Sequence, residues 1–457
     1  MIVLAAGQGK RMKSDRPKVA HRVVGKSLVE WVLRAVAPAN PDSLAVVLGH
    51  GADAVRPLLG TQPVVGIQED QLGTGHATKV GLGVLGELDD DDTVVVLYGD
   101  MPLLTPELIK SLVARPDDTG VVMVTTDLDD PSGYGRILRV DGDVVGVVED
   151  RDCDSEQRLI TEINAGVYAF RAGALVEALA AIGSENAQGE QYLTDVIGIL
   201  ASKGVKLEAV KADAEEVIGI NSQDQLAEAG KILRRRINDG HMVAGVKIVD
   251  PDRTYIDSEV EIAPGATIYP GVHLEGATKV GANAQVGPDV LARDSQIGDD
   301  SLVWYSVLRS AVVGSHCEVG PYASLRAGTV LADRSKVGTF VETKNAKLGE
   351  GAKAPHLTYL GDATVGSGTN IGAGTITCNF DGYEKHATVI GDDVFIGSDT
   401  MLVAPLTIGD RAITGAGSAI TKDVEADALA VERSEQKTIP GYARRRAERQ
   451  ATKKAEE

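Results

Sequence analysis

The sequence contains few aromatic residues and few cysteines. Only 4% of its 457 residues are aromatic while 43% are hydrophobic, which favours folded domains whose narrow cores are filled by Ile, Val, Leu and Ala. Cys153, Cys317 and Cys378 are odd in number and widely spaced. They match neither a disulfide framework nor the spacing of metal ligands, so we expect a cytoplasmic protein in a reducing environment.

Excess positive charge, targeting segments and membrane spans are also missing. The net charge of −20 argues against a nucleic-acid partner, because binding phosphate requires a basic surface. The exception is a basic tail, residues 444–454, for which we expect a solvated, mobile segment. The apolar start, residues 1–6, is too short for a signal peptide, and no later run is long enough to span a membrane.

An aliphatic side chain returns at every sixth residue through much of residues 250–425. Neither a helix nor a simple strand has this period, but a coil of three short strands joined by corners does, with one aliphatic side chain per face pointing to the axis. The pattern predicts a parallel β-helix and resembles the hexapeptide-repeat acyltransferases, whose coils wind left-handed. The repeating positions are Ile256, Ile262, Ile268, Leu274, Val280 and Val286, then Ile297, Val303, Val313, Val319, Leu325, Leu331, Val337, Val365, Ile371, Ile390, Ile396, Leu402 and Ile408.

The first half of the chain alternates short β-rich runs with helical patterns, which predicts an α/β domain with a Rossmann-like, mostly parallel sheet over residues 1–221. In such sheets, ligands bind at the carboxyl ends of the strands. A polar helix with an apolar stripe is expected over residues 222–239, within a linker of residues 222–243. Residues 244–457 then form the β-helix domain with its basic tail. The expected strands are residues 3–4, 44–48, 93–97, 121–125 and 166–170, and the expected helices are residues 28–36 and 106–113.

A glycine-containing loop, residues 4–12, follows the first expected strand and is itself followed by Pro17 and Lys18. Glycines let backbone N–H groups approach phosphate oxygens, and Arg11 and Lys18 can neutralise a triphosphate. The alternative interpretation is a tight turn with surface cations. The whole string resembles the signature of sugar-nucleotide pyrophosphorylases, although that family usually has Thr where this chain has Lys10.

Further polar groups suited to nucleotide-sugar chemistry follow in order. Asp100 comes just after the expected strand 93–97, where a carboxylate can hold Mg²⁺ against phosphates, and Asn221, at the last strand-like edge, could complete the metal shell. Gln68 and the turn at residues 71–77 suit the edge of a pyrimidine. Taken singly, each has a structural alternative as a cap, a turn former or a surface acid. The residues suited to sugar hydroxyl and acetamido groups are 133–137, Glu149 and 162–166.

Charged and aromatic residues interrupt the hexads of the second half. Arg326 and Lys344 form a pair of cations that suits a sugar phosphate. His356 opens the string His-Leu-Thr-Tyr-Leu-Gly-Asp, which is not a generic hexad, and histidine suits removal of a proton from an amine near neutral pH. A purely structural prism and a loop histidine are the alternatives.

Both halves together resemble, along essentially the whole chain, the bifunctional uridyltransferase and glucosamine-1-phosphate acetyltransferase family that makes UDP-N-acetylglucosamine in bacteria. The resemblance implies acetyl transfer from acetyl-CoA to glucosamine 1-phosphate, then attack of the product on UTP with release of pyrophosphate. It also implies a Mg²⁺ cofactor, a cytoplasmic location and a homotrimer. Phe380 stands where the family commonly has Tyr, and the chain begins almost on its first strand, which leaves open a start upstream of Met1.

The resemblance also implies roles for individual residues. Lys18 and His356 are the implied catalytic residues, with His356 as the base of acetyl transfer. The implied ligands of UTP and UDP-N-acetylglucosamine are Leu4, Ala5, Ala6, Gly7, Lys18, Gln68, Gly73, Thr74, Tyr98, Gly135, Glu149, Asn164 and Asn221, with Asp100 and Asn221 on Mg²⁺. The implied ligands of glucosamine 1-phosphate are Arg326, Lys344, Tyr359 and Asn370, and those of acetyl-CoA are Ala373, Asn379, Phe380, Ser398, Ala416 and Arg433.

Two rival interpretations remain at this point. A single-activity sugar-nucleotide pyrophosphorylase could use its β-helix only for assembly, and this would be favoured by the absence of the His356 string. A non-catalytic scaffold, similar to translation exchange-factor subunits, predicts eroded sites. Lys18, Asp100 and His356 all stand in complete motifs, which favours the bifunctional enzyme.

Overall fold

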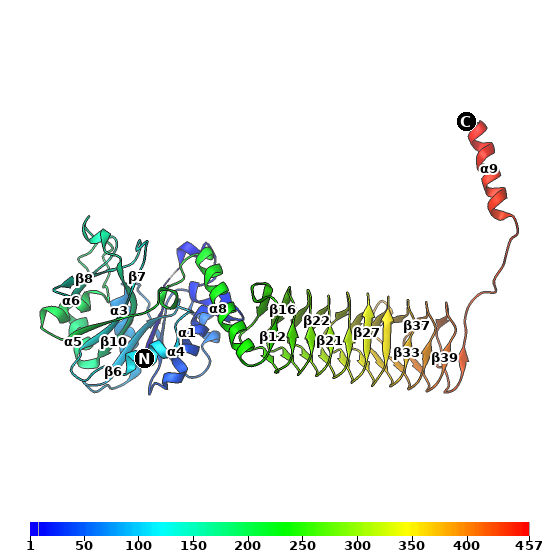
Figure 1. Cartoon of the computed structure of the whole chain (residues 1–457), viewed down its shortest axis with the longest axis horizontal. Coiled ribbons are helices and arrows are strands. Elements are labelled where there is room, and N and C mark those ends of the chain that lie inside the picture. The colour runs from blue at the N-terminus through cyan, green and yellow to red at the C-terminus, as the bar shows by residue number, and fades with distance from the viewer. Residues whose placement is uncertain (8, 457) are drawn as a thin grey trace. The chain divides into compact units, whose positions relative to one another are not determined.

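The computed structural model of the protein describes residues 1–7 and 9–456, which fall into two compact units, Met1–Asp239 and Gly240–Glu457. Gln8 and Glu457 lie outside the described residues, as do the side chains of Lys10, Ala455 and Glu456. The departure at Lys10 from the pyrophosphorylase signature therefore falls outside what the structure describes. Figure 1 shows a helix-covered sheet in the first unit and a stack of coils in the second.

A mixed, mostly parallel sheet forms the centre of the first unit, with strand order β11-β7-β10-β6-β1-β4-β5. β1 pairs in parallel with β4 and β6, whereas β10 is antiparallel to β6 and β7. The hairpin of β8 (Arg136–Val140) and β9 (Asp143–Val148) joins β10. The expected α/β fold is thus confirmed. The path strands are β1 (Ile2–Ala5), β4 (Ala45–Leu48), β5 (Val64–Ile67), β6 (Thr93–Tyr98), β7 (Val121–Asp127), β10 (Glu162–Arg171) and β11 (Leu207–Lys211).

Helices cover both faces of this sheet, because each face carries its own apolar cluster. α1 (Leu28–Val36) and α4 (Pro106–Val113) contribute buried side chains to one cluster. α3 (Thr74–Leu85), α5 (Ala172–Ala181) and α6 (Asp195–Ser202) contribute to the other. α1 begins where expected because the Ser27 side chain and the Glu30 side chain form a reciprocal capping box.

α8 (Gln223–Val243) is longer than the helix expected over residues 222–239. Its apolar stripe, including Ala229 and Leu233, is buried against Leu28 and Leu103. Because this packing attaches the helix to the sheet domain, most of α8 belongs to the first unit.

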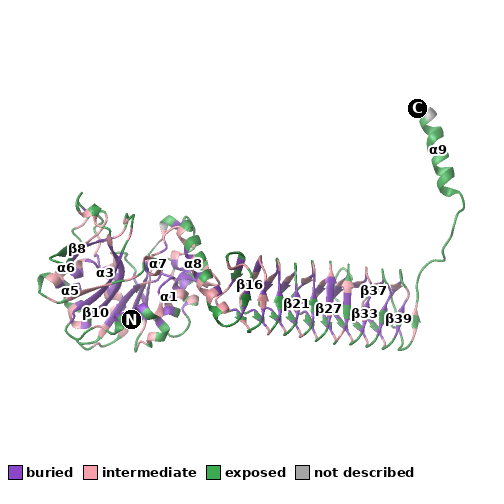
Figure 2. Cartoon of the chain, in the orientation of Figure 1, coloured by how far each residue is buried: buried purple, intermediate pink, exposed green. Residues whose placement is uncertain are grey.

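The second unit is a left-handed parallel β-helix of hexapeptide repeats, as expected. Three sheets form its faces, here called the first face (eleven strands, β12 to β41), the second face (ten strands, β13 to β40) and the third face (nine strands, β14 to β38). Of the expected inward positions, Ile262 is half-buried and the others are buried. Figure 2 shows these buried strands between exposed corners. The faces begin at β12 (Lys247–Ile248), β13 (Thr254–Ile256) and β14 (Glu261–Ile262) and end at β41 (Leu429–Ala430), β40 (Ala419–Ile420) and β38 (Leu406–Ile408).

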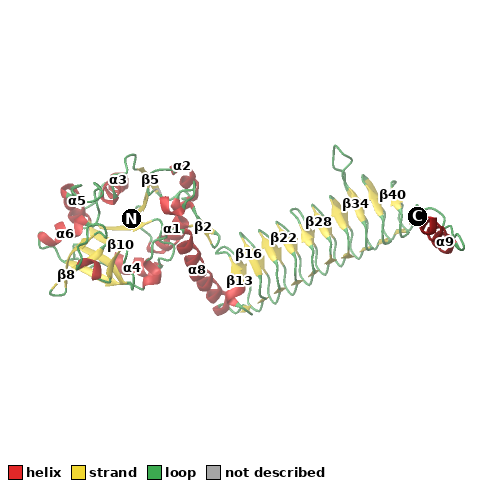
Figure 3. Ribbon diagram, turned by 90° about the horizontal axis from the view of Figure 1, so that it is seen from above, coloured by secondary structure: helices red, strands yellow, loops and turns green. Residues whose placement is uncertain are grey.

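Two segments depart from the regular coils. An insertion, residues 379–387, connects β34 (Ile376–Cys378) to β35 (Thr388–Ile390), and it projects from the stack beside β34 in Figure 3. The basic tail, expected to be solvated and mobile, is exposed from Tyr442 to Lys454 and contains a helix that was not expected, α9 (Tyr442–Glu456). Its alanines and long charged side chains are good helix formers, which the charge pattern alone did not indicate.

Candidate active sites

Three of the predicted residues converge at the carboxyl ends of the central strands. Lys18 lies in a short 3₁₀ turn (Lys18–Ala20), and its ammonium group donates to Asp100 Oδ2 and, at 3.0 Å, to Asn221 Oδ1. The side chains of Lys18 and Asp100 are each 14% exposed, so the cation and its two oxygen partners remain open to a ligand.

The expected position of Asn221 was wrong in one respect. Asn221 does not lie at a strand edge but in the loop between α7 (Ala214–Val217) and α8. The backbone N–H of Ile220 donates to the carbonyl of Asp100 at 2.9 Å, which holds this loop beside the end of β6. The contact is between residues far apart in the sequence, so local pattern could not place it.

The glycine-containing loop brings Lys18 to this cluster. Gly9 has a φ of +63°, and a Cβ atom there would lie 2.5 Å from Lys18 Cβ, so a side chain would displace the lysine. Leu4, Ala5 and Ala6 are buried at the end of β1, and Gly7 is exposed. These residues therefore form the floor of the cluster, with Gly7 at its open side.

A second group of predicted residues is built around the loop before α3. Gln68 is 4% exposed, and its amide nitrogen donates to the carbonyl of Gly73 at 3.0 Å. Thr74 begins α3, and its hydroxyl accepts the N–H of Leu193 at 3.0 Å. Gly73 has a φ of +107°, and a Cβ atom there would meet the carbonyl of Gln191 at 2.5 Å. The loop is thus held rigidly against residues 191–193.

Of the predicted sugar-binding residues, Asn164 lies in β10, Gly135 directly precedes β8 and Glu149 directly follows β9. The N–H of Asn164 donates to the carbonyl of Gly135 at 2.8 Å, and its side-chain amide donates to the Tyr168 hydroxyl at 2.6 Å. Burial raises the pKa of Glu149, whose carboxylate accepts the Thr194 hydroxyl at 2.8 Å. Burial and the nearby charge of Glu149 raise the pKa of Tyr98, so Tyr98 also lies close to this carboxylate.

In the β-helix, one cluster forms where the second face turns into the third. Asp362 Oδ1 accepts the side-chain amide of Asn345 at 2.8 Å, and Asp362 Oδ2 accepts that of Asn379 at 2.6 Å. Lys344 Nζ lies 3.7 Å from the same Oδ2 atom. Contact with Lys344 lowers the pKa of Lys385, which the 379–387 insertion carries. Two cations therefore share one carboxylate at this edge, which favours binding of an anion.

Of the other predicted glucosamine 1-phosphate ligands, Arg326 and Tyr359 lie close enough to Lys344 to affect its pKa. Arg326 follows a strand of the second face and donates to Glu342 at 2.8 Å, and Tyr359 lies on that face and pairs with Glu342 in register. Asn370 lies on the first face, in β33 (Asn370–Ile371), and pairs with Lys353 and Phe395. The single chain does not bring Asn370 to the other three.

A column of predicted residues runs along the edge between the first and second faces. His356 ends β30 (Lys353–His356) and is exposed. In the coils that follow, the carbonyl of Ala373 accepts the N–H of Asp399 at 2.6 Å, and the carbonyl of Ser398 accepts the N–H of Gly417 at 2.8 Å. Arg433 Nη1 donates to the carbonyl of Ala416 at 2.9 Å. His356, Ala373, Ser398, Ala416 and Arg433 therefore form one line along this edge, in which Ala373 is half-buried and the other four are exposed.

The single chain thus divides the predicted acetyl-transfer residues between two edges of the prism. Asn379 and Phe380 lie at the edge of the 379–387 insertion, with Phe380 59% exposed. The column of His356 lies at the other edge of the second face. The prediction that these residues act together therefore requires a contribution from another copy or a movement of the insertion.

Several residues in these clusters were not predicted. Asp362 and Lys385 complete the anion-binding edge, and Gln191 and Thr194 hold the Thr74 loop and Glu149. Asp362 is the last residue of the string that begins at His356, and its charge could have indicated that it belongs to a site. Lys385, Gln191 and Thr194 stand in loops whose partners are distant in sequence, and no local pattern indicated them.

Comparison with known proteins agrees with this architecture. Residues 1–195 match the family model of the MobA-like NTP transferase domain, and residues 387–422 match that of the bacterial transferase hexapeptide (six repeats). The bifunctional protein GlmU of Streptomyces avermitilis is 46% identical over 100% of this chain and 96% of its own length. The chain belongs to the GlmU family. The GlmU proteins of Heliobacterium modesticaldum (48% identical, 95% of this chain and 96% of that protein) and Mycolicibacterium vanbaalenii (47%, 98% and 93%) are similar over almost their full lengths.

Membership of the GlmU family confirms the resemblance inferred from the sequence. The chain is a bifunctional enzyme in which a nucleotidyltransferase unit is joined to a hexapeptide-repeat acetyltransferase unit. Among the residues that the structure describes, no helix is both long enough and apolar enough to cross a membrane.

Proposed function

We propose that the chain makes UDP-N-acetylglucosamine in the cytoplasm by two consecutive transfers. Residues 244–457 transfer an acetyl group from acetyl-CoA to glucosamine 1-phosphate, and residues 1–221 transfer a uridylyl group from UTP to the product with release of pyrophosphate. The observation that carries the proposal is the convergence of Lys18, Asp100 and Asn221 on one open cluster in a chain that also carries the His356 column.

In the uridylyl step, the protein positions two anions and neutralises their charge. The backbone of residues 4–7 and the Gln68–Thr74 loop hold UTP, while Gly135, Glu149 and Asn164 hold the sugar. Tyr98 forms part of the wall between them. Lys18 takes up charge as pyrophosphate leaves, since a fixed cation at the site of developing charge stabilises the transition state. No covalent intermediate with the protein is needed.

The residues at this cluster fit a Mg²⁺ ion. Asp100 Oδ2 and Asn221 Oδ1 already face one cation, the Lys18 ammonium, and carboxylate and amide oxygens are the ligands that Mg²⁺ prefers. Asp100 and Asn221 are therefore the residues that would hold the ion at this cluster. When bound, Mg²⁺ neutralises charge on the phosphates.

In the acetyl step, the amine of glucosamine 1-phosphate attacks the thioester of acetyl-CoA. Arg326, Lys344, Tyr359 and Asn370 hold the sugar phosphate, and His356 accepts the proton of the attacking amine. Ala373, Ser398, Ala416 and Arg433 hold acetyl-CoA along the column, and Asn379 and Phe380 flank the reacting groups. An Asn379 or backbone donor stabilises the oxyanion.

A homotrimer completes the acetyl-transfer site. Most of the predicted residues are divided between two edges of the prism, and Asn370 lies on the first face. A neighbouring copy therefore supplies the site residues that one chain does not bring together. A cyclic trimer joins two different surfaces of the same chain at every interface, as this arrangement requires, whereas a two-fold dimer joins the same surface of both chains.

One assay tests both activities. The purified protein is mixed with glucosamine 1-phosphate, acetyl-CoA, UTP and Mg²⁺, and free thiol and pyrophosphate are followed separately. We expect thiol release without UTP, and pyrophosphate release only when the acetylated sugar phosphate is present or has been made. Thiol release that never leads to pyrophosphate release would contradict the proposed sequence of steps.

A further inference from the structure

Thr194 contacts the carboxylate to which we assign sugar binding. Its hydroxyl donates to Glu149 Oε1 at 2.8 Å, and Thr194 itself is 4% exposed. The bond joins residues 45 positions apart in the sequence. It leaves the second oxygen of Glu149 available to accept a hydrogen bond from a sugar hydroxyl, because an ionised carboxylate has several acceptor positions.

The Thr194 hydroxyl has no competing local role. Thr194 stands at the N-cap position of α6, where a threonine side chain commonly accepts a backbone N–H, yet its side chain makes no capping bond. Its backbone is already in the right-handed helical region, with φ −61° and ψ −26°. The hydroxyl is therefore directed to Glu149 instead of to its own helix.

The short segment that carries Thr194, residues 191–194, is also fixed to the nucleotide loop. Gln191 donates its N–H to the carbonyl of Leu72 at 2.7 Å and accepts the N–H of Gly75 at 2.8 Å. Leu193 donates to the Thr74 hydroxyl at 3.0 Å. One rigid segment thus touches the loop assigned to UTP and the carboxylate assigned to the sugar.

We propose that Thr194 is a positioning residue for uridylyl transfer. Its hydroxyl fixes the orientation of Glu149 toward the sugar, and the segment that carries it connects this carboxylate to the loop that holds UTP. This inference rests on the sugar-binding role of Glu149 stated under the proposed function. Thr194 touches neither substrate, and it acts only through the carboxylate.

The charges around Glu149 make this hydrogen bond important. Burial raises the pKa of Glu149, the Thr194 hydroxyl opposes that rise, and Asp195, Asp152 and Asp150 increase it. From the other elements packed nearby, the hydroxyls of Tyr98, Tyr168 and Tyr192 also lie in the field of Glu149. Loss of the Thr194 hydroxyl therefore raises the pKa of Glu149 further and favours its uncharged form.

Replacement of the hydroxyl by a methyl group tests the proposal. Thr194→Val should lower kcat/KM for N-acetylglucosamine 1-phosphate by about tenfold to a hundredfold, since a hydrogen bond to a buried charge is lost. The KM for UTP should stay the same, because the backbone bonds of residues 191–193 remain. The acidic limb of the pH profile should move to higher pH. Thr194→Ser should restore both the rate and the pH profile.

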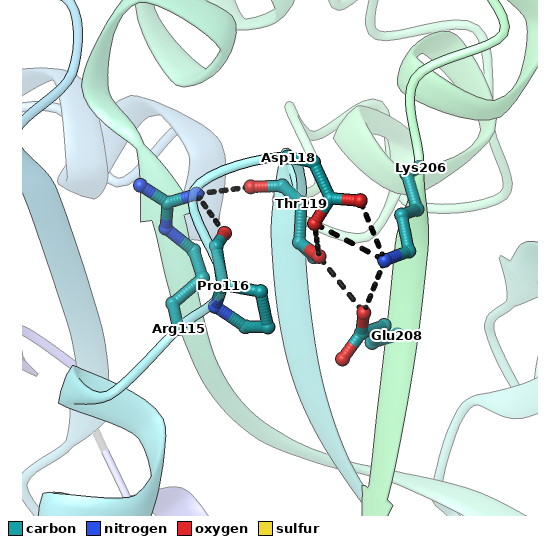
Figure 4. Close-up of polar contacts among 6 residues, drawn as sticks. All are labelled: Arg115, Pro116, Asp118, Thr119, Lys206 and Glu208. Carbon is teal, nitrogen blue, oxygen red and sulfur yellow. Dashed lines mark hydrogen bonds and ion pairs between the residues drawn. The ribbon is translucent and has the colours of Figure 1, made fainter.

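Thr119 offers a matched control in the same unit (Figure 4). Its hydroxyl donates to Glu208 Oε1 at 2.8 Å and Thr119 is fully buried, so the donor and the bond length match those of the Thr194 contact, while Glu208 is more exposed and also pairs with Lys206 at 2.9 Å. Thr119 precedes β7, at the end of the sheet opposite the carboxyl ends that carry Asp100. Thr119→Val removes the same hydroxyl and should leave kcat/KM and the pH profile of uridylyl transfer as in the unchanged protein.

The outcomes separate this inference from the function on which it rests. Glu149→Gln should raise the KM for the sugar phosphate; if it does not, the assignment of Glu149 fails. If Glu149→Gln has that effect while Thr194→Val matches Thr119→Val in rate and pH profile, the sugar-binding role stands and the positioning role of Thr194 is overturned. Circular dichroism reports whether each variant is folded, and retained acetyl-transfer activity shows that its second unit is intact.

Discussion

The two units of the chain gather their predicted residues in opposite ways. In the first unit, Lys18, Asp100 and Asn221 come from three distant segments, and one chain brings them into direct contact. In the β-helix, His356 and Lys344 come from successive coils, yet they lie at different edges of one face. An open sheet collects its loops at one end, whereas a prism distributes them along its edges. A sheet can therefore complete a site alone, whereas the acetyl-transfer site proposed for the prism takes residues from a neighbouring copy.

Removal of the metal-binding carboxylate should separate the units most strongly. Asp100→Ala is expected to reduce pyrophosphate release by about a thousandfold or more, because it removes several kcal/mol of transition-state stabilisation. Thiol release in the acetyl assay should continue. The measurement is the parallel assay of thiol and pyrophosphate, with circular dichroism as a check of folding. If both activities fell together in a folded protein, the two units would not hold separate sites.

Loss of the proposed base should give the converse result. His356→Ala is expected to reduce acetyl transfer by about a hundredfold to ten-thousandfold, the usual contribution of a positioned base. Uridylyl transfer from UTP to added N-acetylglucosamine 1-phosphate should be unchanged. Acetyl transfer at the original rate would show that His356 is structural, with Glu342 or water as the base.

The need for a neighbour can be tested by mixing two inactive chains. Arg326→Ala and His356→Ala chains, co-expressed with different tags and purified as mixed trimers, should recover acetyl transfer at about a third of the original rate, because each mixed trimer has one intact site if a site takes one residue from each of two copies. Each variant alone is the control. If acetyl transfer is not recovered, or if light scattering shows that the active protein is a monomer, one chain completes the site. The contrast between the two units would then be lost.

The sequence predicted the β-helix in more detail than it predicted the sites. The hexad period identified the inward side chains because every coil needs an aliphatic side chain at the same positions. Of the expected inward positions, only Ile262 is less buried than expected. The contacts of Asp362 with Asn379 and of Thr194 with Glu149 depend on turns that meet only after folding. The loop position of Asn221 and the helix α9 were missed for related reasons, since the first depends on tertiary contact and the second on propensity within a charged run.

The smallest expected effect concerns stability. Burial raises the pKa of Glu149, so the folded chain holds that proton more tightly than the unfolded chain does. Ionisation of Glu149 therefore costs stability once the pH exceeds the pKa of the unfolded state, and the cost fades as the pH falls below it. Glu149→Gln should raise Tm near pH 8 and lose this advantage in acid, while uridylyl transfer falls. A variant with a lower Tm at pH 8 would contradict this account of the carboxylate.

The column of His356, Ala373, Ser398 and Ala416 has a fixed length. Consecutive coils place these residues one strand spacing apart, so the line from His356 to Ala416 measures about 14 Å. Parallel strand pairing between successive coils fixes this spacing, so the column cannot lengthen or shorten to suit another molecule. Under the proposed function, a donor bound along this column spans three strand spacings, and a chain with one coil inserted between residues 374 and 397 should favour a longer donor.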